Sequence, residues 1–470
     1  MTDFALSIGG RLVAGEGSFA VRNPANSEVV GVSPDASRTQ LDEAVAAARA
    51  AFPAWAALSA AARREKLSAL AAAMMSQIEP LKRLLTSEQG KPLPDAEMEI
   101  AGAAYFIDGT ASLEIPPKVI EDSDERHVEI GHVPLGVVGA IAPWNYPVIL
   151  ALWKVGLALT AGNTVVLKPS PFTPLTTLKI GELAQDVLPP GVLNVVAGGD
   201  ALGPWMTSHP DIDKISFTGS TATGRRVMQG AADTLKRITL ELGGNDAAIV
   251  MPDVDIDHAA QELFWGAFRN AGQICMASKR IYVHSDIYRR FAEAFVAYAQ
   301  SVKVGDGAEQ GTQIGPINNR PQFDRVVELI EDAKASGLTF LLGGEVTEGE
   351  GLFLPISVID NPPEEARIVQ EEQFGPIVPL MKFDDVEDVV TRANATPFGL
   401  GNSVWSSNQD EALAIARRLD SGIVWVNECQ YLSPFIPFGG HKQSGIGVEG
   451  GAEGLHEFLA TKTVSLRRTP

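Results

Sequence analysis

The sequence predicts an α/β fold in which a mostly parallel sheet is covered by helices on both faces. Four short apolar runs, each of a length suited to a buried strand, alternate with helix-length segments in the middle of the chain. Such alternation is typical of parallel strands joined by helical crossovers. The apolar runs are 137–142, 164–167, 193–196 and 214–217, and the helical segments between them are 149–161, 174–187 and 201–208.

The residues on either side of this region predict further helices and a second α/β unit. Ser37 and Gln40 have the spacing of a capping box before an Ala-rich helix over 41–51. A second helical face follows, formed by Leu67, Leu70, Ala71, Met74 and Ile78. The second α/β unit runs from about Gly244 to Phe438, with a strand at 280–284 and helices at 287–302 and 322–335.

Two further segments, 126–133 and 462–466, alternate between polar and apolar residues like exposed strands. Exposed strand edges carry unpaired backbone groups that pair readily with another chain. We therefore expect both segments to be edges that invite pairing with another subunit.

Composition excludes several classes of protein. A chain of 470 residues is too long for one ordinary core, and its net charge of −20 argues against a nucleic-acid partner. The start of the chain lacks the basic segment and apolar run of a signal peptide, and the most apolar long stretch, 147–167, contains Lys154 and Asn163. The two cysteines, Cys275 and Cys429, suit a reducing compartment. We expect a soluble, cytoplasmic protein with no membrane partner.

The segment 214–224 predicts a strand, a glycine turn and the start of a helix, where backbone N–H groups favour a phosphate. Gly219 and Gly224 have the spacing of the first half of a phosphate loop. However, Arg225-Arg226 stands where that motif requires Lys followed by Ser or Thr, and the Gly-x-Gly-x-x-Gly dinucleotide pattern is absent. Phosphate binding and a plain strand–helix connection both stay open here.

Cys275 is a candidate nucleophile. A thiolate attacks carbonyl carbons and then leaves readily from a thioester, but this role calls for a lowered thiol pKa. The alternative is that Cys275 is a small buried apolar residue.

Glu241 and Asn145 are the other candidate catalytic residues. Glu241 ends an apolar, strand-like run, where burial would raise its pKa towards the range of a general base. Asn145 follows the run 137–142 in a stiff loop between two prolines, where its amide could donate to an oxyanion. The alternatives are an ion pair or solvent exposure for Glu241 and an ordinary turn for Asn145.

These signals occur together in one known pattern. The matching segments, in chain order, are Pro143-Trp-Asn145, Lys168-Pro-Ser170, Phe217-Thr-Gly-Ser220, Glu241-Leu-Gly-Gly244, Gly272-Gln-Ile-Cys275, Glu371-Glu-Gln-Phe-Gly-Pro376 and Pro437-Phe-Gly-Gly440. Over nearly its whole length, from Asn23-Pro24 to the C-terminal strand, the chain resembles the aldehyde dehydrogenase superfamily. The resemblance implies a Rossmann-like cofactor domain (1–115 and 135–243) and an α/β catalytic domain (244–438). It also implies a small β element (116–134 and 458–470) that bridges the subunits of a homodimer or homotetramer.

The resemblance also implies the chemistry, which is oxidation of a small aldehyde with NAD⁺ or NADP⁺ and without a catalytic metal. Cys275 would be the nucleophile and Glu241 the base, and Asn145 with the backbone N–H of Cys275 would form the oxyanion hole. Because relatives that pass the acyl group to coenzyme A lack this glutamate, its presence favours a free acid as the product. The implied cofactor contacts are Ala142, Trp144, Lys168, Gly199, Gly219, Ser220, Leu242, Glu372 and Phe374, with Lys168 and Glu372 on the two riboses.

One departure from the family pattern concerns the choice of cofactor. NAD-selective relatives carry a Glu three residues after the lysine, where it binds the ribose 2′-hydroxyl, and this chain has Pro171 there. NADP⁺ is therefore not repelled at that position, and we favour NAD⁺ only slightly.

The substrate tunnel, by position, would be lined by Tyr146, Ile149, Trp153, Arg269, Ile274, Met276, Tyr431 and Leu432. Most of these are apolar, which suits an aromatic or medium-chain aldehyde. Arg269 is the exception, because succinate-semialdehyde dehydrogenases use this arginine to bind a carboxylate. Their second arginine falls at Trp153, so a semialdehyde substrate and an ordinary ion pair for Arg269 both stay open.

Three other functions were weighed. A phosphate-loop enzyme lacks its Lys-[Ser/Thr] pair, and a non-catalytic member of the fold would be expected to lose Cys275 or Glu241. A cysteine hydrolase would share the acyl-enzyme step, but it would not explain Lys168, Glu372 and Phe374.

Overall fold

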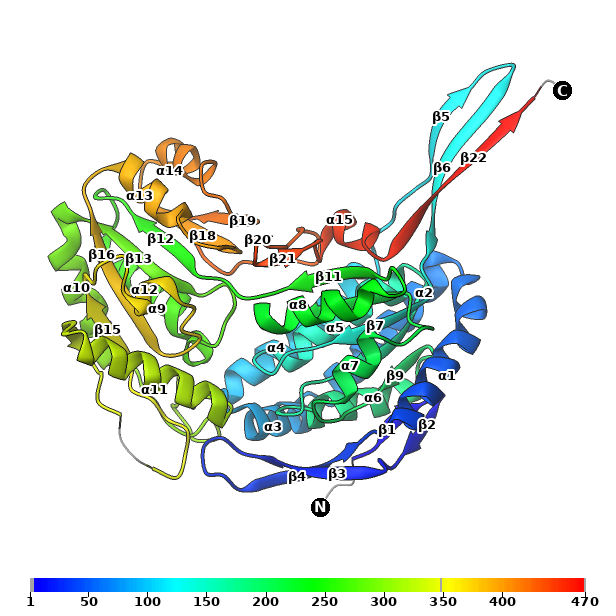
Figure 1. Cartoon of the computed structure of the whole chain (residues 1–470), viewed down its shortest axis with the longest axis horizontal. Coiled ribbons are helices and arrows are strands. Elements are labelled where there is room, and N and C mark those ends of the chain that lie inside the picture. Colours follow the sequence, from blue (N-terminus) through cyan, green and yellow to red (C-terminus); the bar gives the residue numbers. More distant parts are fainter. Residues whose placement is uncertain (1–3, 347–348, 469–470) are drawn as a thin grey trace.

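The computed structural model describes residues 4–346 and 349–468. It has two α/β units and a three-stranded sheet that projects from them as a long arm (Figure 1). Among the helices of the described ranges, none combines the length and apolar composition needed to span a membrane.

The first unit is built on an eight-stranded sheet with the order β2-β1-β9-β8-β7-β10-β11-β21. Its strands are β1 (Leu6–Ile8), β2 (Arg11–Val13), β7 (Val137–Ile141), β8 (Thr164–Lys168), β9 (Leu193–Val195), β10 (Lys214–Thr218), β11 (Arg237–Glu241) and β21 (Gly445–Ile446). The strands β9, β8, β7, β10 and β11 are all parallel, so the predicted parallel core is confirmed. Their carboxyl ends meet at one edge of the sheet, where ligands bind in folds of this type.

Helices cover this sheet in layers. They are α1 (Arg38–Ala56), α2 (Ala60–Ser76), α3 (Ile78–Gln89), α4 (Leu93–Thr110), α5 (Pro147–Thr160), α6 (Leu175–Gln185), α7 (Leu202–Thr207), α8 (Thr221–Ala232) and α15 (Gly451–His456). The helices α5 and α6 contact each other and pack on β8 and β9, while α1 and α7 contact each other and pack on β7. Since α5 is apolar nearly all round, it is almost wholly buried.

The expected helix starts and faces are confirmed with one exception. Ser37 and Gln40 form both hydrogen bonds of the capping box at the start of α1. Leu67, Leu70, Ala71 and Met74 are buried on one face of α2. Ile78 belongs instead to the next helix, α3. Pro80 explains the break, because proline has no N–H and is tolerated only in the first turn of a helix.

The second unit has a seven-stranded sheet with the order β14-β15-β16-β13-β12-β18-β19. Its strands are β12 (Asp246–Val250), β13 (Ser278–His284), β14 (Phe340–Leu342), β15 (Ser357–Asp360), β16 (Ile377–Phe383), β18 (Gly401–Trp405) and β19 (Ile423–Val426). Its helices are α9 (Ile256–Phe268), the 3₁₀ turn η1 (Arg269–Gly272), α10 (Ser285–Gln300), α11 (Arg320–Ala335), α12 (Arg367–Gln370), α13 (Val386–Asn394) and α14 (Gln409–Ala416). Two strand pairs complete the described chain: β3 (Gly17–Arg22) with β4 (Val29–Asp35), and β17 (Phe398–Gly399) with β20 (His441–Lys442).

The projecting arm corrects one expectation. The strand β6 (Arg126–Pro134) pairs along its whole length with β22 (Leu459–Arg467), and β5 (Lys118–Asp122) pairs with its other side. The segment 126–133 is therefore the middle strand and not an edge, because its backbone groups are paired on both sides. The free edges belong to β5 and β22, the two outer strands of the arm (Figure 1).

Candidate active site

A cavity of about 390 Å³ lies where α4 and α5 of the first unit meet the α9–η1 segment of the second. Its wall includes nine of the residues named from the sequence: Asn145, Tyr146, Ile149, Trp153, Arg269, Ile274, Cys275, Met276 and Leu432. Further apolar lining comes from Met98, Phe106, Trp265 and Phe438. The folded chain thus brings a cysteine, an amide and a mainly apolar tunnel together.

The backbone just before Cys275 adopts an uncommon conformation. Asn270, Ala271 and Gly272 follow one another with φ of 51°, 56° and 73°, all in the left-handed region. Such conformations are costly for residues other than glycine and persist only where the surroundings impose them. At Gly272 an added Cβ would lie 2.2 Å from the Gly375 carbonyl oxygen, so only glycine fits. This sharp turn presents Cys275 to the cavity.

Asn145 is buried, and both ends of the residue are held. Its side-chain Nδ2 donates to the Gln273 carbonyl at 2.9 Å, two residues from Cys275. Its own carbonyl accepts from Asn270 Nδ2 at 3.0 Å and from Lys91 Nζ at 3.1 Å. One N–H of the Asn145 amide has no partner among the described residues, so it is available to an oxygen atom in the cavity.

Glu241 is the last residue of β11 and is only 4% exposed. It lies outside the cavity wall but within electrostatic range of Cys275, and neither of its carboxylate oxygens has a hydrogen-bond partner in the described chain. Burial raises the pKa of Glu241 well above its usual value, and the nearby carboxylate of Glu449 raises it further. Glu449 itself is bound to Lys154 Nζ at 2.5 Å and to Ser216 Oγ at 2.9 Å. A buried carboxyl with a raised pKa suits proton abstraction near neutral pH.

The Cys275 thiol is held in its neutral form by burial. Burial raises the pKa of the Cys275 thiol to about 12, although the nearby Lys279 lowers it in part. Lys279 is itself buried, and its Nζ donates to the carbonyl oxygens of Ile274 and Cys275 and pairs with Glu372 at 3.3 Å. A nucleophilic role calls for a thiolate, so attack by Cys275 requires a base that takes its proton.

Several predicted cofactor contacts lie at the carboxyl ends of the parallel strands. Lys168 ends β8 and is 6% exposed, and among the described residues its Nζ donates only to the Pro169 carbonyl. Burial lowers the pKa of Lys168 to about 8, and the carboxylates of Asp200 and Asp35 oppose that shift. A buried ammonium without a close ion pair is suited to ribose hydroxyls. Beside it, Gly199 opens onto a hollow of about 440 Å³, and a Cβ added there would meet nothing within 4 Å.

Two other predicted cofactor contacts, Ser220 and Glu372, accept hydrogen bonds from backbone N–H groups. Ser220 caps α8 by accepting from the N–H of Thr223, immediately after Gly219 at the end of β10. Glu372 Oε1 accepts from the N–H of Gly244 at 3.0 Å. A Cβ on Gly243 would lie 2.3 Å from Glu372 Oε2, so the glycine is needed for this approach.

Two aromatic residues pack nearby, and two buried backbone positions complete the predicted set. The ring of Trp144 meets that of Phe374 edge to face, with 5.4 Å between centroids. Ala142 and Leu242 are buried at the ends of β7 and β11. These residues fit an extended dinucleotide that would run from Lys168 to Glu372.

Tyr431 does not lie where the sequence analysis placed it. It is 55% exposed and outside the cavity wall, and its carbonyl accepts from Trp425 Nε1 at 3.0 Å. In the same loop, Cys429, Gln430 and Leu432 line the cavity and Tyr431 does not. Contacts made by loop side chains depend on such local bonds and have no periodic signal in the sequence.

The sequence analysis also missed several site residues. The sequence could have indicated Phe438, a cavity residue, because it belongs to the matching segment Pro437-Phe-Gly-Gly440. Asp35 and Lys91 were not, because each lies more than fifty residues along the chain from the residue it approaches. Within the described residues, no cluster of three or more His, Cys, Asp or Glu is arranged to hold a metal ion.

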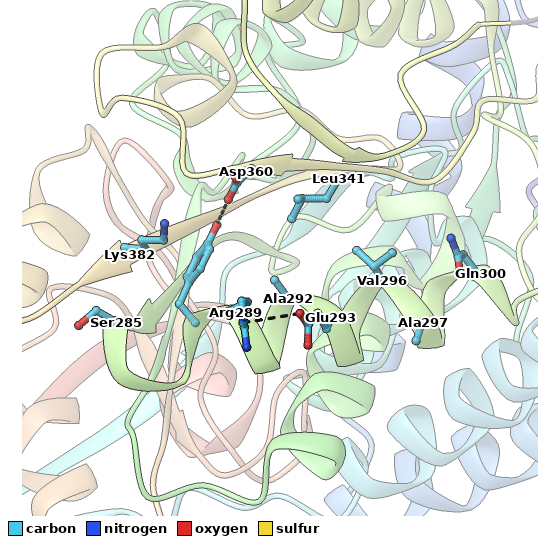
Figure 2. A pocket seen from close by; sticks show the side chains of 11 residues that line it. Ser285, Arg289, Ala292, Glu293, Val296, Ala297, Gln300, Leu341, Asp360 and Lys382 are labelled. Atoms are coloured by element: carbon cyan, nitrogen blue, oxygen red, sulfur yellow. Dashed lines mark hydrogen bonds and ion pairs between the residues drawn. The ribbon is translucent and has the colours of Figure 1, made fainter.

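A larger hollow of about 640 Å³ lies elsewhere, between α10 and the strands β14, β15 and β16 (Figure 2). Its polar side chains bind one another: Tyr288 Oη donates to Asp360 at 2.7 Å, and Arg289 pairs with Glu293 at 3.7 Å. None of the residues named from the sequence as site residues lines it. The chemistry-bearing residues gather at the smaller cavity.

Comparison with known proteins shows the family of the chain. The model of the aldehyde dehydrogenase family matches residues 12–464. A probable aldehyde dehydrogenase of a Pseudomonas species is 44% identical and covers 99% of this chain and 95% of its own length. The NAD⁺ complex of a Bacillus cereus aldehyde dehydrogenase superposes with a TM-score of 0.97 at 36% identity, covering 99% of this chain and 97% of that one.

A second solved relative is the betaine aldehyde dehydrogenase of Staphylococcus aureus in complex with NAD⁺, with a TM-score of 0.96 at 33% identity over 99% of this chain and 95% of that one. The match extends over nearly the full length of each relative, and it includes both α/β units. The chain therefore belongs to the aldehyde dehydrogenase family, and it is an oxidoreductase that uses NAD(P)⁺.

Proposed function

We propose that this enzyme oxidises a neutral, apolar aldehyde to a carboxylic acid through a thioester on Cys275. The observation that carries the proposal is the shared cavity wall of Cys275 and Asn145, with Glu241 buried and unpaired within electrostatic range of the sulfur. A nucleophile, an oxyanion donor and a base are the groups that this reaction requires.

The first step is attack of the Cys275 sulfur on the aldehyde carbon. Because the thiol pKa is raised to about 12, its proton must leave as the C–S bond forms, and Glu241, an unpaired carboxylate within electrostatic range, would accept it. The aldehyde oxygen becomes an oxyanion, which accepts from the free N–H of Asn145 and from the backbone N–H of Cys275. The product of this step is a thiohemiacetal that retains the aldehyde hydrogen.

The second half of the reaction releases the acid. Bound NAD(P)⁺ supplies the oxidising power by accepting that hydrogen as hydride. Hydride loss leaves a thioester on Cys275, and Glu241 releases the proton that it took from the thiol to solvent, which restores its carboxylate. Glu241 then removes a proton from a water molecule that attacks the thioester, the C–S bond breaks, and Cys275 takes that proton back from Glu241 as the acid leaves. No hydrogen bond in the described chain restrains the Glu241 carboxylate, which leaves it free to turn towards the cavity for this step.

The cavity lining suits a neutral substrate better than an anionic one. Asp95 and Glu262 line the wall with Arg269, so a substrate carboxylate near the arginine would also meet two carboxylates. The second arginine of a carboxylate clamp is absent, because Trp153 stands there. The remaining lining is largely apolar. A medium-chain or aromatic aldehyde therefore fits the cavity, and a semialdehyde is the less favoured alternative.

NAD⁺ is the favoured cofactor for a reason that the sequence analysis did not find. Pro171 supplies no carboxylate, but Asp35 and Asp200 are close enough to Lys168 to affect its pKa. Asp35 Oδ1 accepts from the N–H of Gly199 at 3.1 Å, which fixes the carboxylate beside the cofactor hollow. These carboxylates would repel a 2′-phosphate and accept from a 2′-hydroxyl.

The arm is proposed to join subunits of a homo-oligomer. Val119, Ile120, Val464 and Leu466 lie on its outer strands and are each more than half exposed. Apolar residues on two free strand edges are suited to burial by a second copy. Both cysteines are free, which is consistent with a cytoplasmic location.

Glu241→Gln removes the base from both halves of the reaction. The burst of reduced cofactor should slow about tenfold or more, because the Cys275 thiol then has no neighbouring base to take its proton, and the steady rate should fall about 10²- to 10⁴-fold, because the water that attacks the thioester loses the same base. Stopped-flow absorbance of the reduced cofactor measures both phases, and Cys275→Ala, which should show no burst but bind cofactor normally, is the control.

The same residue sets the expected pH dependence. In the wild type the steady rate should fall with decreasing pH at a higher pH than an ordinary glutamate would give, because the raised pKa of Glu241 keeps its basic form only above that pKa. An unchanged steady rate in Glu241→Gln would remove this residue from its proposed role.

Arg269→Ala tests the substrate class. The measured quantity is kcat/KM for a semialdehyde divided by kcat/KM for a neutral aldehyde of equal length. If a neutral aldehyde is the substrate, this ratio should change by less than about threefold. Loss of a charge-assisted bond to a carboxylate would instead lower the ratio about tenfold or more. Arg290→Ala, on the exposed side of α10, is the matched control.

Asp35→Asn, alone and with Asp200→Asn, tests cofactor selection. The Kd of NADP⁺ should improve about tenfold relative to that of NAD⁺, because a repelling charge is removed. Isothermal titration without aldehyde measures both constants, and Asp410→Asn in the second unit is the control. An unchanged ratio in the double variant would show that these carboxylates do not select the cofactor.

Val464→Asp with Leu466→Asp tests the subunit contact. Charges on the outer strand of the arm should shift the particle towards the monomer, because they cannot be buried without a partner. Light scattering after gel filtration measures the mass, and Leu235→Asp, at a position that is 90% exposed, is the control. A mass that stays equal to the wild type would contradict an interface at this strand.

A further inference from the structure

A buried ion pair lies directly behind Asn145. Lys91 Nζ is 2.5 Å from Glu99 Oε2, and both side chains are fully buried. The remaining contacts of Lys91 point to one loop, since its Nζ donates to the Asn145 carbonyl at 3.1 Å and lies over the Tyr146 ring. Glu99 also reaches the cavity wall.

The other oxygen of Glu99 binds the helix that follows this loop. Glu99 Oε1 accepts from the N–H of Val148 at 2.8 Å and of Ile149 at 3.3 Å. These groups belong to the first turn of α5, whose N-cap residue, Tyr146, provides no side-chain cap. Glu99 thus caps α5 from another helix. Lys91 thus binds the carbonyl of Asn145 itself, and Glu99 binds the start of the helix a few residues after it.

Stability alone does not account for this pair. Taking two charges out of water costs about as much as their attraction returns, so apolar residues of similar size would serve a core equally well. What an apolar pair could not supply is a donor aimed at the Asn145 carbonyl and an acceptor for the start of α5. Oxyanion stabilisation depends on a donor fixed in advance, because small displacements lower the rate strongly.

We propose that Lys91 and Glu99 are positioning residues that fix Asn145 for oxyanion binding. The proposal rests on the proposed role of Asn145 in the reaction. Neither residue touches the reacting atoms, since both act through the loop over 143–147 and the first turn of α5.

The test is the double variant Lys91→Met/Glu99→Gln. It removes both charges together, which avoids leaving one buried and unpaired, and Gln keeps an acceptor for the α5 N–H groups. We expect the rate of the first turnover, measured as the reduced-cofactor burst, to fall about tenfold or more. The Kd of the cofactor and the apparent KM of the aldehyde should stay within about twofold of the wild type.

The matched control is Lys82→Met/Glu97→Gln. Lys82 and Glu97 form an ion pair at 2.6 Å on the outside of the same region, between α3 and α4, and so this change should leave the burst rate unchanged. If the buried double variant does not fold, as judged by circular dichroism and thermal melting, Lys91→Gln/Glu99→Gln, which also removes both charges, is measured in its place.

A mutant cycle with Asn145→Ala distinguishes positioning from a general effect. Asn145→Ala alone should lower the burst rate about 10²- to 10³-fold, as loss of an oxyanion donor does. In the Asn145→Ala background, the Lys91/Glu99 changes should then lower the burst rate little further. An equal fold-loss in both backgrounds, or no loss in either, would overturn the proposal. If Asn145→Ala itself keeps the wild-type burst rate, the oxyanion role fails instead.

Discussion

The active site depends on a pair of hydrogen bonds that cross between the two α/β units. Asn145 Nδ2 donates to the Gln273 carbonyl, and Asn270 Nδ2 donates back to the Asn145 carbonyl. Each bond joins the loop after β7 to the left-handed turn before Cys275. Because buried polar groups are costly when unpaired, these bonds resist any relative shift of the two loops. The cavity, the oxyanion donor and the sulfur keep their relative places for this reason.

Burial gives the three ionisable groups of the site their protonation states. It raises the pKa values of Cys275 and Glu241 and lowers that of Lys168, so that each group favours its neutral form more than it would in water. A neutral thiol is less prone to adventitious reaction, and a carboxyl with a raised pKa accepts a proton more readily. In the proposed reaction, the rate of attack would therefore depend on proton removal by the base and not on a preformed thiolate.

The selectivity that we propose would arise from charges near the cavity and near the cofactor hollow. Asp95 and Glu262 line the cavity together with Arg269, so the apolar lining would favour a neutral substrate over an anionic one. On the cofactor side, Asp35, the last residue of β4, accepts a hydrogen bond from the N–H of Gly199. In both places the selecting charge comes from a part of the chain remote from the residue it influences.

The sequence by itself determined the parallel sheet, the family and the identity of Cys275, Glu241 and Asn145 as candidates, because strand and helix periods and short motifs are local properties of the chain. Only the tertiary structure decided that Arg126–Pro134 is a middle strand, that Tyr431 lies outside the cavity, and that the Cys275 pKa is raised. It also decided the pairing of Lys91 with Glu99 behind Asn145. These outcomes depend on which distant segments meet and how much water they exclude, and no local pattern encodes either.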